Sequence, residues 1–132
     1  MRSVEEVSQK LMEEVVESLS QYKSCRYVVE RYIVSLGQLT IAICPMKSGD
    51  DKNGTYVTFR TVKYIQLPTY WENASFQLAT KSECLDFLKS VNLEIVEDVP
   101  YLFYVQLPTS KINIVFHSVL ISGTSPWDEE KV

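Results

Sequence analysis

The sequence predicts an α+β protein, with one antiparallel β-sheet of five to seven strands and two helices packed on one of its faces. Three observations support this class. A helix-period apolar stripe opens the chain, period-two segments rich in Val, Ile and Tyr follow, and a second helix signal comes only after four such segments. The strands come in hairpin-sized pairs and do not alternate with helices, so we expect an antiparallel sheet in the order α-ββββ-α-ββ(β).

Two segments have the apolar spacing of helices. The first covers residues 3–22, where apolar side chains recur at steps of three and four: Val4, Val7, Leu11, Val15, Leu19 and Tyr22. The second covers residues 80–91. It opens with Thr80 and Glu83 at the spacing of a capping box, and Asn92 at its end tolerates a left-handed backbone.

The strands are predicted from period-two alternation. The first two, at 27–36 and 39–44, are joined by Gly37 and Gln38 as a two-residue turn with glycine first. A polar loop at 46–54 leads to an unusually long third strand at 55–67, and a short fourth strand follows at 74–79. After the second helix we expect an optional short strand at 93–96, then a hairpin of 101–107 and 112–122 around Pro108.

Two stretches nearly repeat each other forty residues apart. Residues 64–69 are YIQLPT and residues 104–109 are YVQLPT, and at this offset seven of fifteen aligned positions are identical. Each copy predicts a strand that runs into a proline turn and returns as a second strand. Either an old duplication or similar turn chemistry in two hairpins accounts for the repeat.

The totals are those of a globular protein with a single domain. We expect 132 residues to form one domain over 1–122, followed by a loose, polar and acidic tail over 123–132. The net charge of −4 argues against a large basic footprint for duplex nucleic acid. No run of eighteen apolar residues is present, so we expect no membrane association and a cytoplasmic location, or the host cytoplasm or virion for a viral protein.

Residues suited to catalysis or metal binding are few. Cys25, Cys44 and Cys84 are widely spaced, which favours free thiols and leaves one disulfide open. Cys84 and His117 are the one combination that could make a thiolate nucleophile, and no local motif supports it. The acids of loop 46–54 lack the other ligands of a calcium loop, and the four glycines are too dispersed for a phosphate-binding loop. We expect no metal and no cofactor; a small enzyme of unknown reaction is the third functional alternative.

One face of the predicted sheet carries the candidate binding residues. Alternation along 55–67 places every second side chain on one face, the repeat adds two more, and the first strand extends the surface through residues 27 and 31. The face consists of Tyr56, Arg60, Tyr64, Gln66, Tyr104, Gln106 and Arg31. Trp71, in the first proline turn, is either a lid over the core edge or an anchor for a partner.

Three uses of this face are open. Tyr and Arg are enriched at the centres of protein interfaces, so the leading hypothesis is a non-enzymatic interaction protein that forms a homodimer or binds a protein partner. A long edge strand at 55–67 would also need pairing, which dimerisation provides. The alternative is a single-stranded nucleic-acid-binding protein whose tyrosines stack on bases. The same residue types also occur on the solvated side of ordinary antiparallel sheets.

Overall fold

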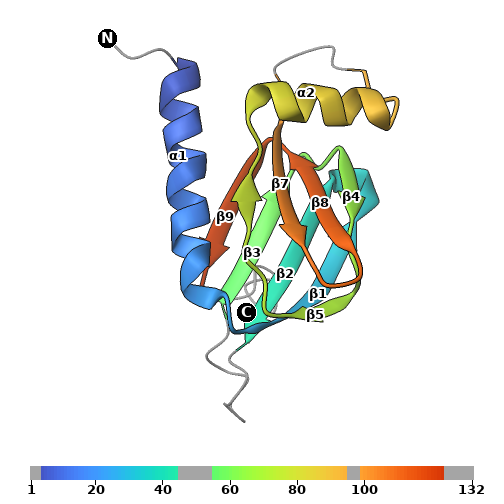
Figure 1. The fold of residues 1–132 in the computed structure, drawn as a ribbon. Helices are drawn as coiled ribbons and strands as arrows, with labels where there is room; N and C mark the ends of the chain where they lie inside the picture. Colours follow the sequence, from blue (N-terminus) through green and yellow to red (C-terminus); the bar gives the residue numbers. More distant parts are fainter. Residues whose placement is uncertain (1–3, 45–54, 95–98, 124–132) are drawn as a thin grey trace.

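The computed structural model describes residues 4–44, 55–94 and 99–123, with side chains from Gln9 onward. The α+β class and the antiparallel pairing are confirmed: the described residues form two α-helices and nine strands. The strands do not form the single sheet that we predicted. They are divided between two sheets that pack face to face, with the main core between them (Figure 1).

Sheet A has five strands and sheet B has four. Across sheet A the order is β5 (Tyr70–Glu72), β1 (Arg26–Ile33), β2 (Gln38–Cys44), β3 (Thr55–Arg60) and β9 (Ser118–Ser122). Across sheet B it is β4 (Tyr64–Gln66), β8 (Lys111–Phe116), β7 (Tyr101–Gln106) and β6 (Gln77–Leu78). The predicted strands 55–67 and 112–122 are therefore each divided between the two sheets.

A bent two-stranded ribbon joins the sheets. In sheet A β3 pairs with β9, and in sheet B β4 pairs with β8, so the same two chain segments run side by side through both sheets. Thr61 marks the bend in the first segment, with a left-handed φ of 53° that ends β3. The two bends lie together, because the His117 amide donates to the Arg60 carbonyl and the Lys63 amide to the Val115 carbonyl. The prediction of one straight strand over 55–67 is therefore wrong.

The repeated segments lie on the two sides of β8 in sheet B, offset from each other by two residues in register. Tyr64–Gln66 is β4, and its counterpart at 104–106 is the end of β7. Both are antiparallel to β8 and lie on either side of it, so they run in the same direction. The turn after the second copy closes the β7–β8 hairpin as predicted, whereas the chain after the first copy enters β5 in sheet A.

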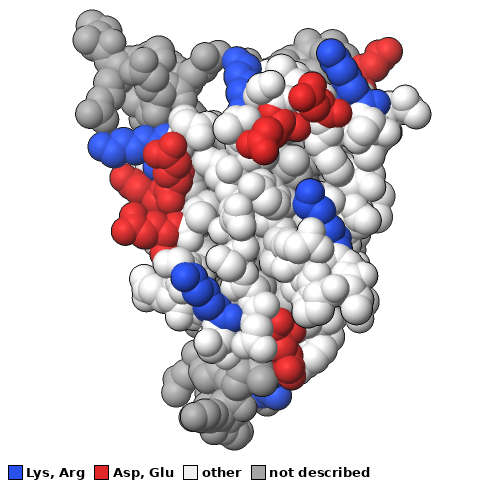
Figure 2. Space-filling view, in the orientation of Figure 1, with Lys and Arg blue, Asp and Glu red and all other residues white. Residues whose placement is uncertain are grey.

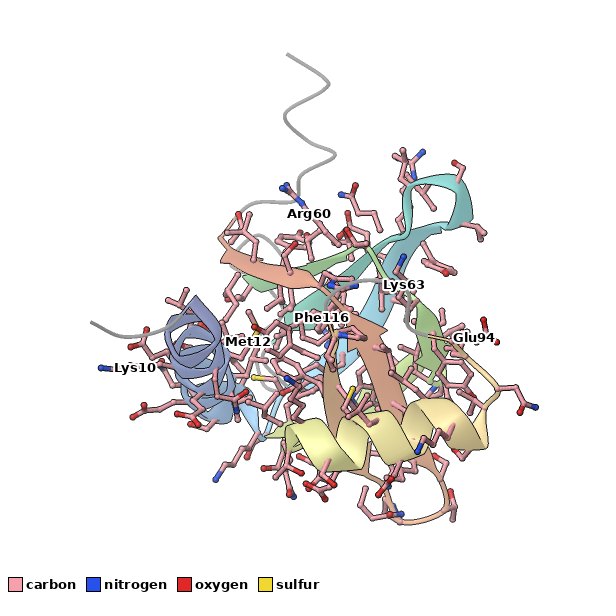
Figure 3. All side chains as sticks on the ribbon, turned by 90° about the horizontal axis from the view of Figure 1, so that it is seen from above. Lys10, Met12, Arg60, Lys63, Glu94 and Phe116 are labelled. Atoms are coloured by element: carbon pink, nitrogen blue, oxygen red, sulfur yellow. The ribbon has the colours of Figure 1, made fainter. Side chains whose placement is uncertain are left out.

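The two helices pack in different places. Met12 and Leu19 of α1 (Val4–Leu19) are buried in the main core, with Val119 and Ile121 of β9 packed against the same cluster. Figure 1 shows α1 alongside β9, and in Figure 3 Met12 points inward from the helix. Leu11, which we predicted on the buried stripe, is exposed. The inward face of the helix runs through Met12 and Leu19, and Leu11 lies beside it.

Helix α2 (Lys81–Ser90) lies on the outer face of sheet B. Its Cys84 and Leu88 form a second apolar cluster with Leu102 and Val115, which point away from the main core. The predicted capping box is present: the Glu83 amide donates to Thr80 Oγ1 at 3.1 Å, and the Thr80 amide to Glu83 Oε1 at 2.9 Å.

The connections differ from prediction in two places. Asn92 has the expected left-handed φ, at 58°, but Leu93 and Glu94 form no strand. The β1–β2 connection is a single 3₁₀ turn (Val34–Leu36) that ends at Gly37, and not a two-residue turn. The predicted loop 46–54 and the tail beyond residue 123 lie outside the described residues.

Gly37 fixes the β1–β2 turn against the bend of the ribbon. It has φ +58°, and its carbonyl accepts a 2.8 Å hydrogen bond from the Val62 amide. A Cβ built on Gly37 would lie 3.2 Å from the Val62 nitrogen and 3.3 Å from its oxygen, which are backbone atoms that cannot rotate away. The position therefore requires glycine for both its conformation and its space.

We predict that Gly37→Ala lowers the free energy of unfolding by about 1–2 kcal/mol, the usual cost of a left-handed L-residue. Urea denaturation followed by circular dichroism measures it. Gly123→Ala is the control, because nothing lies within 4 Å of a Cβ at that position. Equal midpoints for the two variants would contradict the role given to Gly37.

Candidate functional site

The predicted binding face is divided by the bend in the ribbon. Alternation holds within each strand, so Tyr56 and Arg60 point outward from sheet A, and Tyr64 and Gln66 point outward from sheet B. The two outer faces lie on opposite sides of the sandwich, and Val62, between the two halves, is buried in the core. The seven residues predicted to share one face therefore belong to two surfaces.

Arg31 joins Tyr56 and Arg60 on sheet A. The register runs from Arg31 to Thr40 and on to Thr58, which alternation places beside Tyr56 and Arg60 on the outer face. We expected Tyr27 on the same surface, but a β-bulge between Val29 and Arg31 shifts the alternation by one residue. Tyr27 is consequently fully buried in the main core.

The predicted residues on sheet B are engaged within the molecule. A polar row crosses the four strands as Gln66, Asn113, Tyr104 and Gln77. Asn113 Nδ2 donates to Gln66 Oε1 at 2.9 Å, and Tyr104 Oη donates to Gln77 Oε1 at 3.0 Å. Lys111 Nζ lies 5.2 Å from the centre of the Tyr104 ring. Figure 2 shows this side of the molecule: its centre carries few charges, and acidic side chains gather over α1.

Helix α2 and the β7–β8 turn take up the other two residues on this side. The Tyr64 ring meets Phe87 of α2 edge-on, with 5.3 Å between ring centres. Gln106 Nε2 donates to the carbonyls of Leu107 and Ser110 at 3.0 and 3.1 Å, which closes the turn. These contacts give Tyr64 and Gln106 structural roles that the sequence did not indicate.

Trp71 is a core residue. Only 5% of its surface is exposed, and its ring stacks on Tyr27 with centres 5.4 Å apart and planes 2° from parallel. It lies in β5 opposite Tyr27, on the inner side of sheet A. Of its two predicted roles, the structure supports the lid on the core edge and leaves no indole face for a partner.

Within the described residues, no helix packs on the outer face of sheet A. One row crosses all five strands as Tyr70, Val28, Ala42, Tyr56 and Ser122. The next row contains Arg31, Thr40, Thr58 and Leu120. Arg26 and Glu72 border these rows at one end and Arg60 at the other. In Figure 3 Arg60 lies on the side of the molecule away from α2.

Three large apolar side chains are exposed on this face. They are Val28 at 36%, Tyr70 at 47% and Leu120 at 52% of their surface. Tyr70 is also held in place: its hydroxyl donates to the Glu72 carboxylate, and this hydrogen bond raises the pKa of Tyr70. Thr40 and Thr58 lie between these apolar residues. Both threonines are buried, and their hydroxyl oxygens are 3.4 Å apart.

Val28, Tyr70 and Leu120 were not among the binding residues predicted from the sequence. Val28 follows Tyr27, which was expected on the outer face, and the bulge that reverses this alternation gives no clear sequence signal. Tyr70 was placed in a turn, although it forms an antiparallel pair with Val28. Leu120 was placed in one strand that the bend at His117 divides. For Tyr70 a signal was present, since Tyr-Trp between proline and asparagine favours a short strand.

The possible Cys84–His117 nucleophile has no support in the geometry. Cys84 lies on the buried face of α2, and its Sγ donates to the Pro100 carbonyl at 3.3 Å. Burial raises the pKa of Cys84, which favours the protonated and unreactive thiol. All three cysteines are free thiols. The pKa of Cys25 is also raised, mainly by burial and to a smaller extent by the nearby Cys44.

The described residues contain no group of three or more His, Cys, Asp and Glu side chains placed to hold a metal ion. In the same part of the chain, neither helix has the length and apolar character needed to cross a membrane. No protein-family model matches the chain, and comparisons with curated proteins and with solved structures give no match. The surfaces themselves therefore carry the functional argument.

We predict that Cys84 reacts with iodoacetamide at pH 8 about tenfold or more slowly in the folded protein than in urea, because the folded state hides the thiol and raises its pKa. Peptide mass spectrometry measures the rate at each cysteine. The half-buried Cys25 and Cys44 serve as internal comparisons. Equal rates at Cys84 in both conditions would contradict the buried thiol.

Proposed function

We propose that this chain is a non-enzymatic interaction protein that binds a protein partner through the outer face of sheet A. The observation that carries the proposal is the exposure of Val28 and Tyr70, which lie opposite each other on β1 and β5, with Leu120 exposed on the same face at the other edge of the sheet. Large apolar side chains grouped on a surface are typical of interaction sites, whereas scattered single ones are not informative.

The arrangement of this face supports the proposal. Its middle rows hold Val28, Ala42 and Tyr56 together with Arg31, and its other charged residues, Arg26, Glu72 and Arg60, stand at the two ends. Protein interfaces have the same plan, with an apolar centre that excludes water and a polar rim. Tyrosine and arginine, both present here, supply a large share of the binding energy in such interfaces.

The opposite side of the molecule is less suited to a partner. On sheet B, α2 covers Leu102 and Val115, and the remaining polar row is linked by internal hydrogen bonds. A partner on that side would have to replace these contacts. The outer face of sheet A has no helix packed on it within the described residues.

A second candidate function is the binding of single-stranded nucleic acid by the same face. It is favoured by Arg26, Arg31 and Arg60 together with Tyr56 and Tyr70, since arginines contact phosphates and tyrosines stack on bases. Glu72 beside Arg26 and the net charge of −4 weaken the attraction for a polyanion. For this reason protein binding is the first proposal.

We predict that a photo-reactive phenylalanine analogue at Tyr70 forms a discrete covalent adduct with a partner protein in cells that express the chain. The added substitution Val28→Glu should reduce the yield about tenfold or more, because it places a charge beside Tyr70 in the apolar row of the face. The same probe at Thr109, exposed in the turn of the opposite sheet, is the control. Adducts that form equally at both positions, or that persist with Val28→Glu, would exclude this face.

For the second candidate, fluorescence anisotropy with labelled oligo(dT) at low salt is the test. If the face binds nucleic acid, Arg60→Ala or Tyr56→Ala should weaken binding about fivefold or more, and affinity should fall as salt rises. Lys111→Ala, a cation on sheet B, is the matched control. No binding of the unmodified protein at low salt would remove this candidate.

A further inference from the structure

The four edge strands of the described sheets differ in how they are protected. β4 and β5 have three residues each and β6 has two, which offers little for another strand to pair with. Lys63 precedes β4, and β5 carries Glu72 and follows Pro68. Short length, charge and proline are the devices by which proteins prevent edge-to-edge pairing.

The edge strand β9 has none of these three devices, and α1 runs alongside it (Figure 1). It is five residues long, and its sequence, Ser118-Val119-Leu120-Ile121-Ser122, contains no charge, no proline and no glycine. It pairs with β3 without a register shift, so no bulge twists it away from the sheet. In an antiparallel edge strand, every second residue turns its amide and carbonyl away from the sheet. A partner strand can therefore add to this edge.

The residue pattern of β9 indicates what that partner strand is. Read from either end, β9 presents serine, a β-branched residue, leucine, a β-branched residue and serine. If a second copy pairs antiparallel about Leu120, each serine faces a serine and Val119 faces the partner's Ile121. Leu120 then meets its own copy across the twofold axis. A twofold interface requires this kind of self-complementarity, and most strands do not have it.

We infer that two copies of this chain associate by antiparallel pairing of their β9 strands, which joins the two A sheets into one continuous sheet. Leu120, 52% exposed in the single chain, would be covered by its copy on the outer face. On the inner face, Val119 and Ile121 already pack against the main core, so their pairing would extend that core across the junction.

The neighbouring elements are compatible with this pairing. Helix α1 and the inner face of β9 both pack on the main core cluster, and Figure 3 shows α1 on the α2 side of sheet A. On the outer face, the row of Arg60 and Ser118 would continue into the partner's Ser122 and the partner's Tyr56. Two predicted binding residues would thus flank the junction, with only small serines between them.

This inference goes beyond the proposed function, because it concerns a strand edge and names a second copy as its occupant. Light scattering should give twice 15.2 kDa for the unmodified chain at high micromolar concentration. Leu120→Lys should raise the dimer dissociation constant about a hundredfold, since it sets two like charges opposite each other at the twofold axis. Leu36→Lys makes the same change at the β1–β2 turn, where Leu36 is 64% exposed, and should leave the dimer intact.

A cross-linking experiment fixes the register. In Leu120→Cys the two introduced thiols would lie opposite one another with Cα atoms about 5 Å apart, within the range of a disulfide. Mild oxidation should give a covalent dimer on a non-reducing gel, and Leu36→Cys should not. Circular dichroism spectra that match the unmodified chain would show that Leu120→Lys acts on association and not on folding.

Each other outcome would overturn the β9 pairing. If light scattering gives a mass of 15.2 kDa for the unmodified chain at high micromolar concentration, the dimer does not form. A dimer that Leu36→Lys disrupts and Leu120→Lys does not would place the interface at the β1–β2 turn. A dimer that gives no Leu120→Cys cross-link would pair through another surface. The photo-cross-linking experiment at Tyr70 is read independently, so partner binding by the outer face can stand when the β9 pairing fails.

Discussion

Contact among three phenylalanine rings holds the two sheets together. Phe59 of β3 meets Phe116 of β8 with ring centres 4.9 Å apart and Phe103 of β7 at 5.9 Å, and the last two lie 4.7 Å from each other. All three are fully buried, and all three pairs meet edge to face, the geometry that aromatic rings prefer. Because one ring comes from sheet A and two from sheet B, this contact fixes the spacing of the sandwich, as Phe116 at the centre of Figure 3 illustrates. The outer surfaces take their positions from it.

Local signals predicted local structure correctly at both helices. Both helices were found from apolar spacing, and the capping box at Thr80 and the left-handed Asn92 followed from chemistry within a few residues. The alternation of side chains along β3 and β4 was also correct within each strand. The sheet to which a strand belongs is set by contacts between distant residues. Thr61 has no glycine or proline to signal a bend, so the division of the strand over 55–67 between two sheets could not be predicted from its sequence.

The dependence of sheet membership on distant contacts also explains why the predicted binding residues do not share one surface. Of the eight predicted residues, Tyr56, Arg60 and Arg31 lie together on the outer face of sheet A, and the others are on sheet B or, for Trp71, in the core. The bulge after Val29 decides that Arg31 and Val28 are on this face and Tyr27 is not. A bulge is a backbone adjustment to neighbouring strands, and the alternation of residue types around it is nearly unchanged. The residue types thus predicted which side chains a binding surface contains, but not where on the molecule that surface lies.

The bent ribbon also bears on how this chain reaches its native state. It brings Tyr56 beside Ser122 and Gln66 beside Asn113, so residues far apart along the chain must meet before either sheet has its full set of strands. Closing such long loops costs entropy before any contact compensates for it, and proteins dominated by non-local pairing fold over about milliseconds to seconds. Since the ribbon contributes two strands to each sheet, neither sheet is complete without the other. We therefore expect the sandwich to assemble slowly and as one cooperative unit.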